Sequence, residues 1–166
     1  TGFEIKAANA APITKEIQRI AFNLISTGAD EDAVRDSIRP IVKELHKGER
    51  PTSDITIHTR IQKDYDDYEK PSAASRSAHY YNTYTNPNDP IRKGNTVQYV
   101  YVDGVPEGQP MIAYGAYKDE KELKGFSIDW STIVEKFVTA KLKLVYKTLE
   151  WDLDSIVKKQ VPKIYW

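Results

Sequence analysis

Helical periodicity at the C-terminal end is the sequence feature that most constrains the fold. After Gly125, apolar residues recur at intervals of three and four over positions 130–149. They are Trp130, Ile133, Val134, Phe137, Val138, Leu144, Val145 and Leu149. This spacing places them along one face of an α-helix, with Asp129 or Ser131 as the expected N-cap. The sequence therefore predicts a long amphipathic helix whose apolar stripe is covered by other elements.

Two shorter helical patterns stand near the N-terminus. Pro12 opens the first, and Gly28 can end it in the left-handed conformation. Asp30 is a suitable N-cap for the second, Gly48 ends it, and Pro40 inside it should kink the helix. Their apolar residues are Ile13, Ile17, Ile20 and Leu24, then Ala33, Val34, Ile38, Ile41, Val42 and Leu45. The two patterns predict an antiparallel helical hairpin.

Strand patterns occupy the middle of the chain. "DITIHTRI" (54–61) alternates, with Ile55, Ile57, Thr59 and Ile61 on one side, and "NTVQYVYV" and "PMIAYGAY" predict two more strands. Residues 64–95 are polar and predict loop with some helix. We expect a mainly α, α+β fold, with a helical hairpin and a long C-terminal helix carrying a small antiparallel β tip. Residues 1–166 would form one domain, with a helical base (1–50 and 126–157), a β-containing tip (51–125) and a tail (158–166).

Composition excludes several classes of function. The chain has no cysteine, which excludes disulfides, zinc thiolates and thiol chemistry. Its 24 basic and 24 acidic residues balance, so binding to nucleic acid must come from local basic faces. No apolar run approaches the ~18 residues of a membrane span, and no signal peptide is visible. We expect a cytoplasmic protein, in the host cytoplasm if the source is viral, with no membrane partner.

The acidic stretch "DYDDYE" suggests metal chemistry at first sight. Asp64, Asp66, Asp67 and Glu69 lie close together in the chain. A two-metal site needs carboxylates that converge from rigid elements, whereas neighbouring side chains on a strand diverge. A solvated acidic loop is therefore the favoured interpretation. A metal-dependent nuclease built on this cluster is the alternative.

Other catalytic patterns are absent from the sequence. His46, His58 and His79 are scattered and lack a spaced carboxylate or a nucleophilic serine. Neither "KGNT" nor "DGVPEG" matches a phosphate-binding loop. We expect no catalytic residue, no metal site and no cofactor in this chain.

Binding chemistry is better represented. Basic residues bracket a region rich in hydroxyl and amide side chains, which are the groups that contact phosphate and sugar without reading base sequence. The basic residues are Arg60, Lys63, Lys70, Arg76, Arg92 and Lys93. The polar residues are Ser72, Ser75, Ser77, Tyr80, Tyr81 and Asn82. An ordinary mixed-charge surface is the alternative interpretation.

The order of these motifs resembles a known family. "GFEI" followed by Pro12, Arg76-Ser77 followed by Tyr81-Asn82, "IRKGNTVQYVYV" and "WSTIVEKFVTAKL" are its elements. Together they resemble the C-terminal thumb region of a family B DNA polymerase, closest to the T-even-like bacteriophage type. Ala74 stands where that pattern has a histidine, and Asn95 stands where it has an acid.

The resemblance implies a part of a DNA-directed DNA polymerase, a nucleotidyltransferase of DNA replication. In this family the Mg²⁺-binding aspartates lie in the palm and the proofreading carboxylates lie further upstream, so this segment alone would be inactive. Its partners would be primer–template duplex DNA and the palm and exonuclease portion of the polymerase. The resemblance assigns duplex contacts to Lys70, Ser72, Ser75, Arg76, Tyr81, Asn82 and Lys93. Residues 64–69 would face away from the DNA or weaken the grip enough for sliding.

The tail "KKQVPKIYW" carries a separate hypothesis. In T-even-like polymerases a short C-terminal peptide inserts aromatics into a sliding clamp, and Ile164, Tyr165 and Trp166 have that composition. A frayed or packed-down terminus is the alternative.

If the chain is one subunit of a split polymerase, an apolar face around Phe3, Ile5 and Ile13 should be exposed. The rival function is a stand-alone module that binds single strands by stacking bases on its tyrosines.

Overall fold

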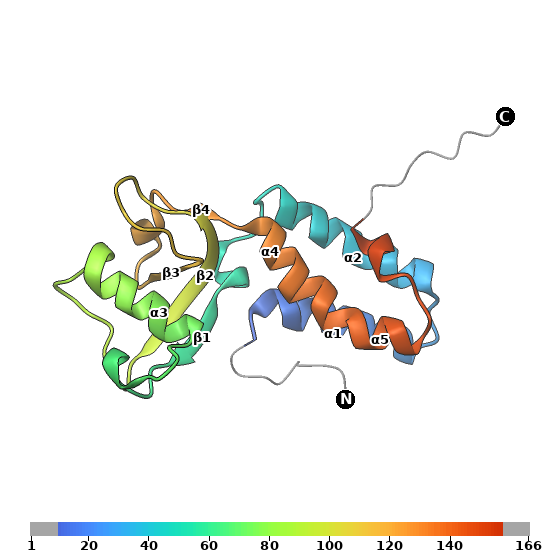
Figure 1. Cartoon of the computed structure of the whole chain (residues 1–166). Helices are drawn as coiled ribbons and strands as arrows, with labels where there is room; N and C mark the ends of the chain where they lie inside the picture. Colours follow the sequence, from blue (N-terminus) through green and yellow to red (C-terminus); the bar gives the residue numbers. More distant parts are fainter. Residues whose placement is uncertain (1–9, 158–166) are drawn as a thin grey trace.

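The computed structural model describes residues 10–157. Helices gather at one end of an elongated molecule, and a small sheet with α3 lies at the other (Figure 1). The fold is α+β and mainly α, as predicted from the sequence. Within residues 10–157, none of the helices is long and apolar enough to cross a membrane.

The predicted hairpin is formed by α1 (Pro12–Ser26) and α2 (Glu31–His46). Pro12 occupies the first turn of α1, where its missing N–H leaves no hydrogen bond unmade. Gly28 (φ 84°) ends α1 in a left-handed turn, and the Asp30 carboxylate caps α2. Pro40 lies inside α2, which continues through it without a break.

The C-terminal helix contains a π-helical turn that the sequence pattern did not show. α4 (Trp130–Val134) is capped by Asp129, one of the two predicted N-caps, and leads into a π turn at Glu135–Thr139 before α5 (Ala140–Thr148). A π turn holds about one residue more than an α turn. Every side chain beyond it is therefore displaced by about 100° around the axis.

This displacement changes which residues of α5 face the core. Leu142 and Tyr146 are 0 % and 1 % exposed, whereas Leu144 and Leu149 are 60 % and 38 % exposed. The predicted apolar stripe was therefore wrong beyond Val138. An uninterrupted α-helix would have turned Leu144 and Val145 inward.

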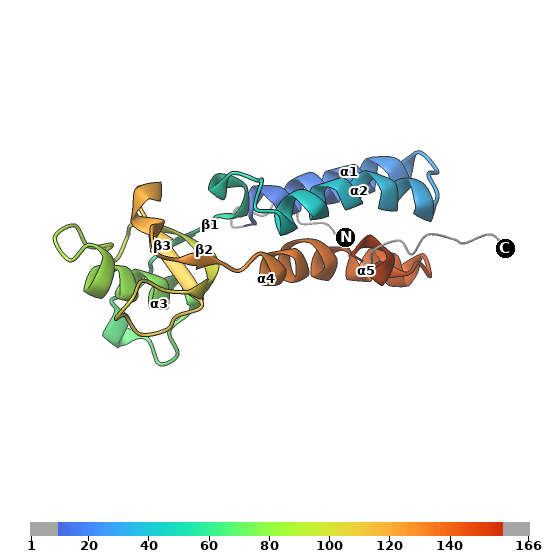
Figure 2. The same cartoon turned by 90° about the horizontal axis from the view of Figure 1, so that it is seen from above.

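The main core lies between two helical layers. Seen from above, α1 and α2 form one layer, and α4 and α5 form the other (Figure 2). Side chains from both layers are fully buried between them, and the Thr14 hydroxyl donates across the layers to the Phe137 carbonyl at 2.9 Å. Ile13 is 0 % exposed, so it cannot belong to the exposed face expected of a split subunit. Phe3 and Ile5 of that expectation lie outside the described residues.

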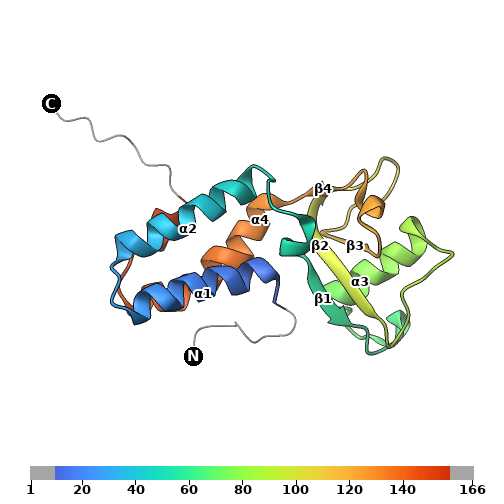
Figure 3. The same cartoon turned by 180° about the vertical axis from the view of Figure 1, so that it is seen from behind.

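The sheet is built around one long strand. β2 (Thr96–Gly104) pairs antiparallel with β1 (Ile57–Arg60) on one edge and with β3 (Tyr114–Tyr117) on the other. The short strand β4 (Ser127–Ile128) pairs with the far end of β2. The sheet lies between α3 and the helical base, as the view from behind shows (Figure 3).

The first strand is shorter than the alternating pattern predicted. Residues Thr52–Ile55 form a 3₁₀ turn, and the strand begins only at Ile57. The Thr56 hydroxyl stabilises the turn by donating to the Thr52 carbonyl at 2.7 Å, and it also contacts the Tyr117 hydroxyl at 2.5 Å. Ile55 still enters the core, so its apolar character reflects burial and not strand pairing.

A second, smaller core lies under α3. α3 (Ala73–Tyr80) is capped by Ser72 and continues into a π turn at Tyr81–Thr85. It packs on β2 and β3 through small residues such as Ala74 and Ala78. Because these side chains are short, the stretch lacks the bulky periodic residues that reveal a helix in sequence.

Arg50 fixes the point where the chain leaves the helices for the sheet. Its guanidinium pairs with Glu16 of α1 at 3.0 Å, Glu44 of α2 at 2.7 Å and Asp54 at 3.4 Å. The bond to Glu16 is the main reason that the pKa of Arg50 is raised above its ordinary value. One side chain therefore ties both hairpin helices to the connection into the sheet.

Candidate nucleic-acid interface

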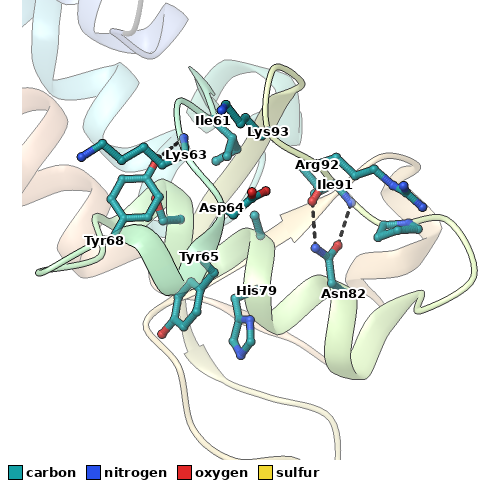
Figure 4. Close-up of a pocket in the computed structure, with 13 residues that line it drawn as sticks. Ile61, Lys63, Asp64, Tyr65, Tyr68, His79, Asn82, Ile91, Arg92 and Lys93 are labelled. Carbon is teal, nitrogen blue, oxygen red and sulfur yellow. Dashed lines mark hydrogen bonds between the residues drawn. The ribbon is translucent and has the colours of Figure 1, made fainter.

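A hollow of about 360 Å³ opens on the sheet end of the molecule, beside α3 (Figure 4). Its walls come from the chain after β1, from α3 with its π turn, and from the loop that precedes β2. Its main polar and charged residues are Lys63, Asp64, Tyr68, Asn82, Arg92 and Lys93. The three segments follow one another along the chain, and the fold turns them to face one hollow.

The loop before β2 is held rigidly against α3. The Asn82 amide donates to the Ile91 carbonyl at 2.8 Å and accepts from the Ile91 N–H at 2.7 Å. At the next turn the Arg92 N–H donates to the Asn95 side chain at 2.9 Å, and Gly94 (φ 89°) provides the left-handed residue. Arg92 and Lys93 are therefore presented from a fixed backbone.

Tyr68 holds the opposite wall. Its hydroxyl accepts from the N–H groups of Lys63 at 3.1 Å and Gln62 at 3.3 Å. A hydrogen bond from Ser75, followed by these N–H groups, lowers the pKa of Tyr68. Lys63 Nζ lies 5.9 Å from the centre of the Tyr68 ring. These contacts fix Lys63 at the rim of the hollow.

The charge of the hollow favours anions. Lys63, Arg92 and Lys93 are exposed, and none of them forms an ion pair with a residue of the described range 10–157. Asp64 opposes them, because its carboxylate points into the hollow (Figure 4). Cationic groups on separate rigid segments suit a phosphate, and the single carboxylate weakens that attraction. Asp64 also shows that the acidic stretch does not turn away from this surface as a whole.

The acidic stretch does not assemble a metal site in the part of the chain that is described. Asp66 and Asp67 lie in an exposed 3₁₀ turn (Tyr65–Asp67). Across residues 10–157, no group of three or more His, Cys, Asp or Glu side chains could hold a metal ion.

The predicted DNA contacts fall into two groups. Lys70, Ser72, Arg76 and Lys93 are exposed. Ser75 and Tyr81 are buried, and Asn82 is half-buried. The hollow brings together Ser75, Asn82 and Lys93, while Lys70 and Ser72 lie outside it and Arg76 faces a neighbouring hollow.

The side chains of the second group also hold the fold. Ser75 bonds to the Ser72 hydroxyl at 3.1 Å, and Asn82 is engaged with Ile91. Tyr81 is only 1 % exposed. These side chains position the surface from within, and their contacts to DNA stay a prediction.

Tyr81 is tied to the chain that follows β3. Its hydroxyl donates to Glu122 Oε2 at 2.5 Å. Burial raises the pKa of Tyr81, and the neighbouring Glu122 carboxylate raises it further. Burial alone would raise the pKa of Glu122, but hydrogen bonds from the Asp119 N–H, Tyr81 and the Lys118 N–H outweigh burial and lower it.

Sequence reasoning assigned neither Lys63 nor Arg92 to the interface, although both belong to the basic set it identified. Lys63 is followed directly by the acidic stretch, so in the sequence it has the pattern of an ordinary mixed-charge loop. Pairing of the segment after β1 with the turn at Gly94, where the Gly94 N–H donates to the Ile61 carbonyl at 2.7 Å, brings both residues to one hollow. That pairing is a tertiary contact without a local signal.

A larger hollow of about 490 Å³ lies between the helical base and the sheet. Its polar groups include Thr14, Thr59, Lys136 and Lys141. Both lysines come from one helical segment, and no loop is fixed around them as the Asn82 amide fixes the loop of the smaller hollow. The smaller hollow is therefore the better candidate for anion binding.

Comparisons with known proteins support the fold. No protein-family model matches the chain, and no curated protein matches it. Among solved structures, the chain is similar to the family B DNA polymerase from the hyperthermophilic archaeon Pyrobaculum calidifontis, with a TM-score of 0.59 and 18 % sequence identity. The match covers 94 % of this chain and 19 % of the polymerase. At this identity the match shows a shared fold with a region of an archaeal enzyme, and it does not support the bacteriophage type.

Proposed function

We propose that this chain is a thumb segment of a family B DNA polymerase that holds the primer–template duplex by its phosphate backbone. The observation that carries the proposal is the hollow that Lys63, Arg92 and Lys93 line on a fixed frame. The similarity in fold over 94 % of the chain supports the same interpretation. The catalytic Mg²⁺ and its aspartates would belong to the palm portion of the polymerase.

Backbone contacts meet the physical requirement of such a grip. A polymerase advances along DNA of any sequence, so its holding contacts must not read the bases. Lysine and arginine contacts to phosphate carry no sequence information, whereas contacts to base edges do. We assign the phosphate contacts to Lys63, Arg92 and Lys93, with Lys70 and Arg76 at the flanks. Asp64 would lower the affinity and thereby favour sliding.

The salt dependence of duplex binding tests the proposal. Each phosphate neutralised contributes about 0.9 to the slope of log affinity against log salt concentration. A variant with Lys63, Arg92 and Lys93 all changed to glutamine should therefore lower the slope by about 2.7. Fluorescence anisotropy with a labelled primer–template duplex between 50 and 200 mM salt gives this slope. Over this range, the fold-loss of duplex affinity in the triple variant should be about 40 times smaller than the fold-loss in the wild type.

The matched control removes equal charge elsewhere. Lys43, Lys143 and Lys147 are exposed on the helical base, and changing all three to glutamine should leave the slope within experimental error. If both triple variants changed the slope equally, only net charge would matter and the assigned interface would be wrong. A wild-type chain that prefers single strands to duplex would contradict the thumb proposal.

An exposed apolar face suits the partner portion of the polymerase. Leu144 and Leu149 are 60 % and 38 % exposed, which places both among the exposed large apolar residues of the base. Ile25, Leu144 and Leu149 line a shallow hollow of about 220 Å³. Apolar side chains gathered in this way mark an interaction surface more often than a free one. We assign this face to contact with the palm and exonuclease portion.

The clamp hypothesis for the C-terminal tail stays a proposal. Ile164, Tyr165 and Trp166 lie outside the described residues, and the support for it is their apolar and aromatic composition beside lysines. Deleting these three residues should abolish binding of the chain to its cognate sliding clamp, measured by surface plasmon resonance. Duplex affinity should stay unchanged. Clamp binding that survives the deletion would contradict the hypothesis.

A further inference from the structure

A second hollow of the tip adjoins the proposed duplex interface. It measures about 210 Å³ and lies on α3, the π turn after it and the loop that carries Met111. The stacked rings of Tyr65 and His79, with centroids 3.8 Å apart and planes at 11°, line both hollows. Figure 4 shows this stacked pair beside the first hollow. The two surfaces are therefore continuous.

Aromatic and apolar groups are unusually exposed in this second hollow. Tyr84 is 44 % exposed and Met111 is 68 % exposed, which places both among the exposed large apolar residues of the described chain. The Tyr84 ring lies 4.8 Å from the ring of Tyr80. The Tyr80 hydroxyl donates to the Pro110 carbonyl at 2.8 Å, so the loop before Met111 is anchored to α3. The backbone that carries these groups is therefore held in place.

A basic group completes the hollow. Arg76 lines it, is exposed, and forms no ion pair with any residue in 10–157. An apolar peptide side chain would cover Tyr84 and Met111 but would make no use of the guanidinium. A nucleotide offers both a planar base for the rings and a phosphate for Arg76.

We propose that this hollow binds one unpaired nucleobase of a DNA strand. The base stacks between Tyr84 and the Tyr65–His79 pair, and Arg76 holds the adjoining phosphate. The volume suits a single ring system, because it is below the ~300–1,000 Å³ of pockets for drug-sized ligands. This inference rests on the proposed function, because it takes nucleic acid as the ligand. It adds a site for an unpaired nucleotide next to the surface that holds the duplex.

Stacking is compatible with a surface that DNA slides across. Every base has an aromatic face, so stacking on tyrosine and histidine is tolerant of sequence. The hollow would therefore hold a frayed or displaced strand without pausing at particular bases. Its contribution would be to keep an unpaired nucleotide beside the duplex.

Comparison of a normal strand with an abasic strand of equal length tests the proposal. Both carry the same phosphates, and only the first carries bases. The wild-type chain should bind oligodeoxythymidylate roughly 5- to 150-fold more tightly than the abasic strand, measured by fluorescence anisotropy. Tyr84→Ala should bring this ratio close to one. Tyr84→Phe, which keeps the ring, should preserve it.

Phe22→Ala is the matched control, because Phe22 is a similarly exposed aromatic on the helical base. The ratio should be unchanged in this variant. A wild-type ratio of one, or a ratio that Tyr84→Ala leaves intact, would overturn the stacking site. Duplex affinity measured in parallel separates the two proposals. If the wild type does not bind duplex DNA, the proposed duplex grip is wrong. The ratio of affinities for the normal and abasic strands tests only the stacking site.

Discussion

Replacement of Leu142 by alanine is expected to lower the free energy of unfolding by about 2–5 kcal/mol. Leu142 is 0 % exposed and lies between the two helical layers, so the shorter side chain leaves a cavity that the packed helices can fill only in part. Urea denaturation followed by circular dichroism gives the change directly.

Leu144→Ala is the matched control, in the same helix and with the same atoms removed. Leu144 is 60 % exposed, so the change in stability should stay within about 0.5 kcal/mol. The contrast depends on the π turn at Glu135–Thr139, which rotates α5 relative to the pattern of the sequence. Similar losses in both variants would show that α5 is not rotated in this way.

Tyr81→Phe is expected to destabilise the protein by about 1.5–3 kcal/mol at neutral pH, the usual worth of a hydrogen bond to a charged group. The substitution removes the hydroxyl that donates to Glu122 at 2.5 Å and leaves the ring in place. Tyr84→Phe removes a hydroxyl from an exposed tyrosine, so it should change stability by less than about 0.5 kcal/mol. Urea titrations of the two variants beside the wild type make the comparison.

The effect of Tyr81→Phe should depend on pH with a defined sign. The pKa of Glu122 is lowered in the folded protein, so its contribution is fully present above the ordinary glutamate pKa and is lost as the pH falls through the lowered value. The pKa of Tyr81 is raised, so its contribution is present below the ordinary tyrosine pKa and is lost as the pH rises through the raised value. The gap between wild type and variant should therefore be widest between these limits. A gap independent of pH would mean that Glu122 is not the partner that matters.

Local signals predicted the helix boundaries well. Pro12, Asp30 and Asp129 each start a helix where the sequence placed the start, and Gly28 takes the left-handed conformation that ends α1. Each helix end depends on hydrogen bonds within a few residues of the boundary, so it can be predicted from the neighbouring residues. The same holds for the fold class, which follows from the helical and alternating periods.

The interface could be predicted only as a set of residue types. The sequence predicted the basic and hydroxyl residues of the tip as DNA contacts, and the structure shows that Tyr81, Asn82 and Ser75 also form hydrogen bonds within the fold. The type of a polar residue does not reveal whether its hydrogen-bond partner is a ligand or a backbone carbonyl. Only the packing of α3 on the sheet distinguishes the two cases.

By itself, the sequence determined the helical hairpin, the small antiparallel sheet and the basic character of the tip, because these follow from periodicity, capping and charge along neighbouring residues. The tertiary structure alone decided the rotation of α5 and the placement of Lys63 and Arg92 around one hollow. A π turn and a hollow between separate segments arise from packing between elements. Packing free energy depends on which surfaces meet, and no local stretch of sequence contains that information.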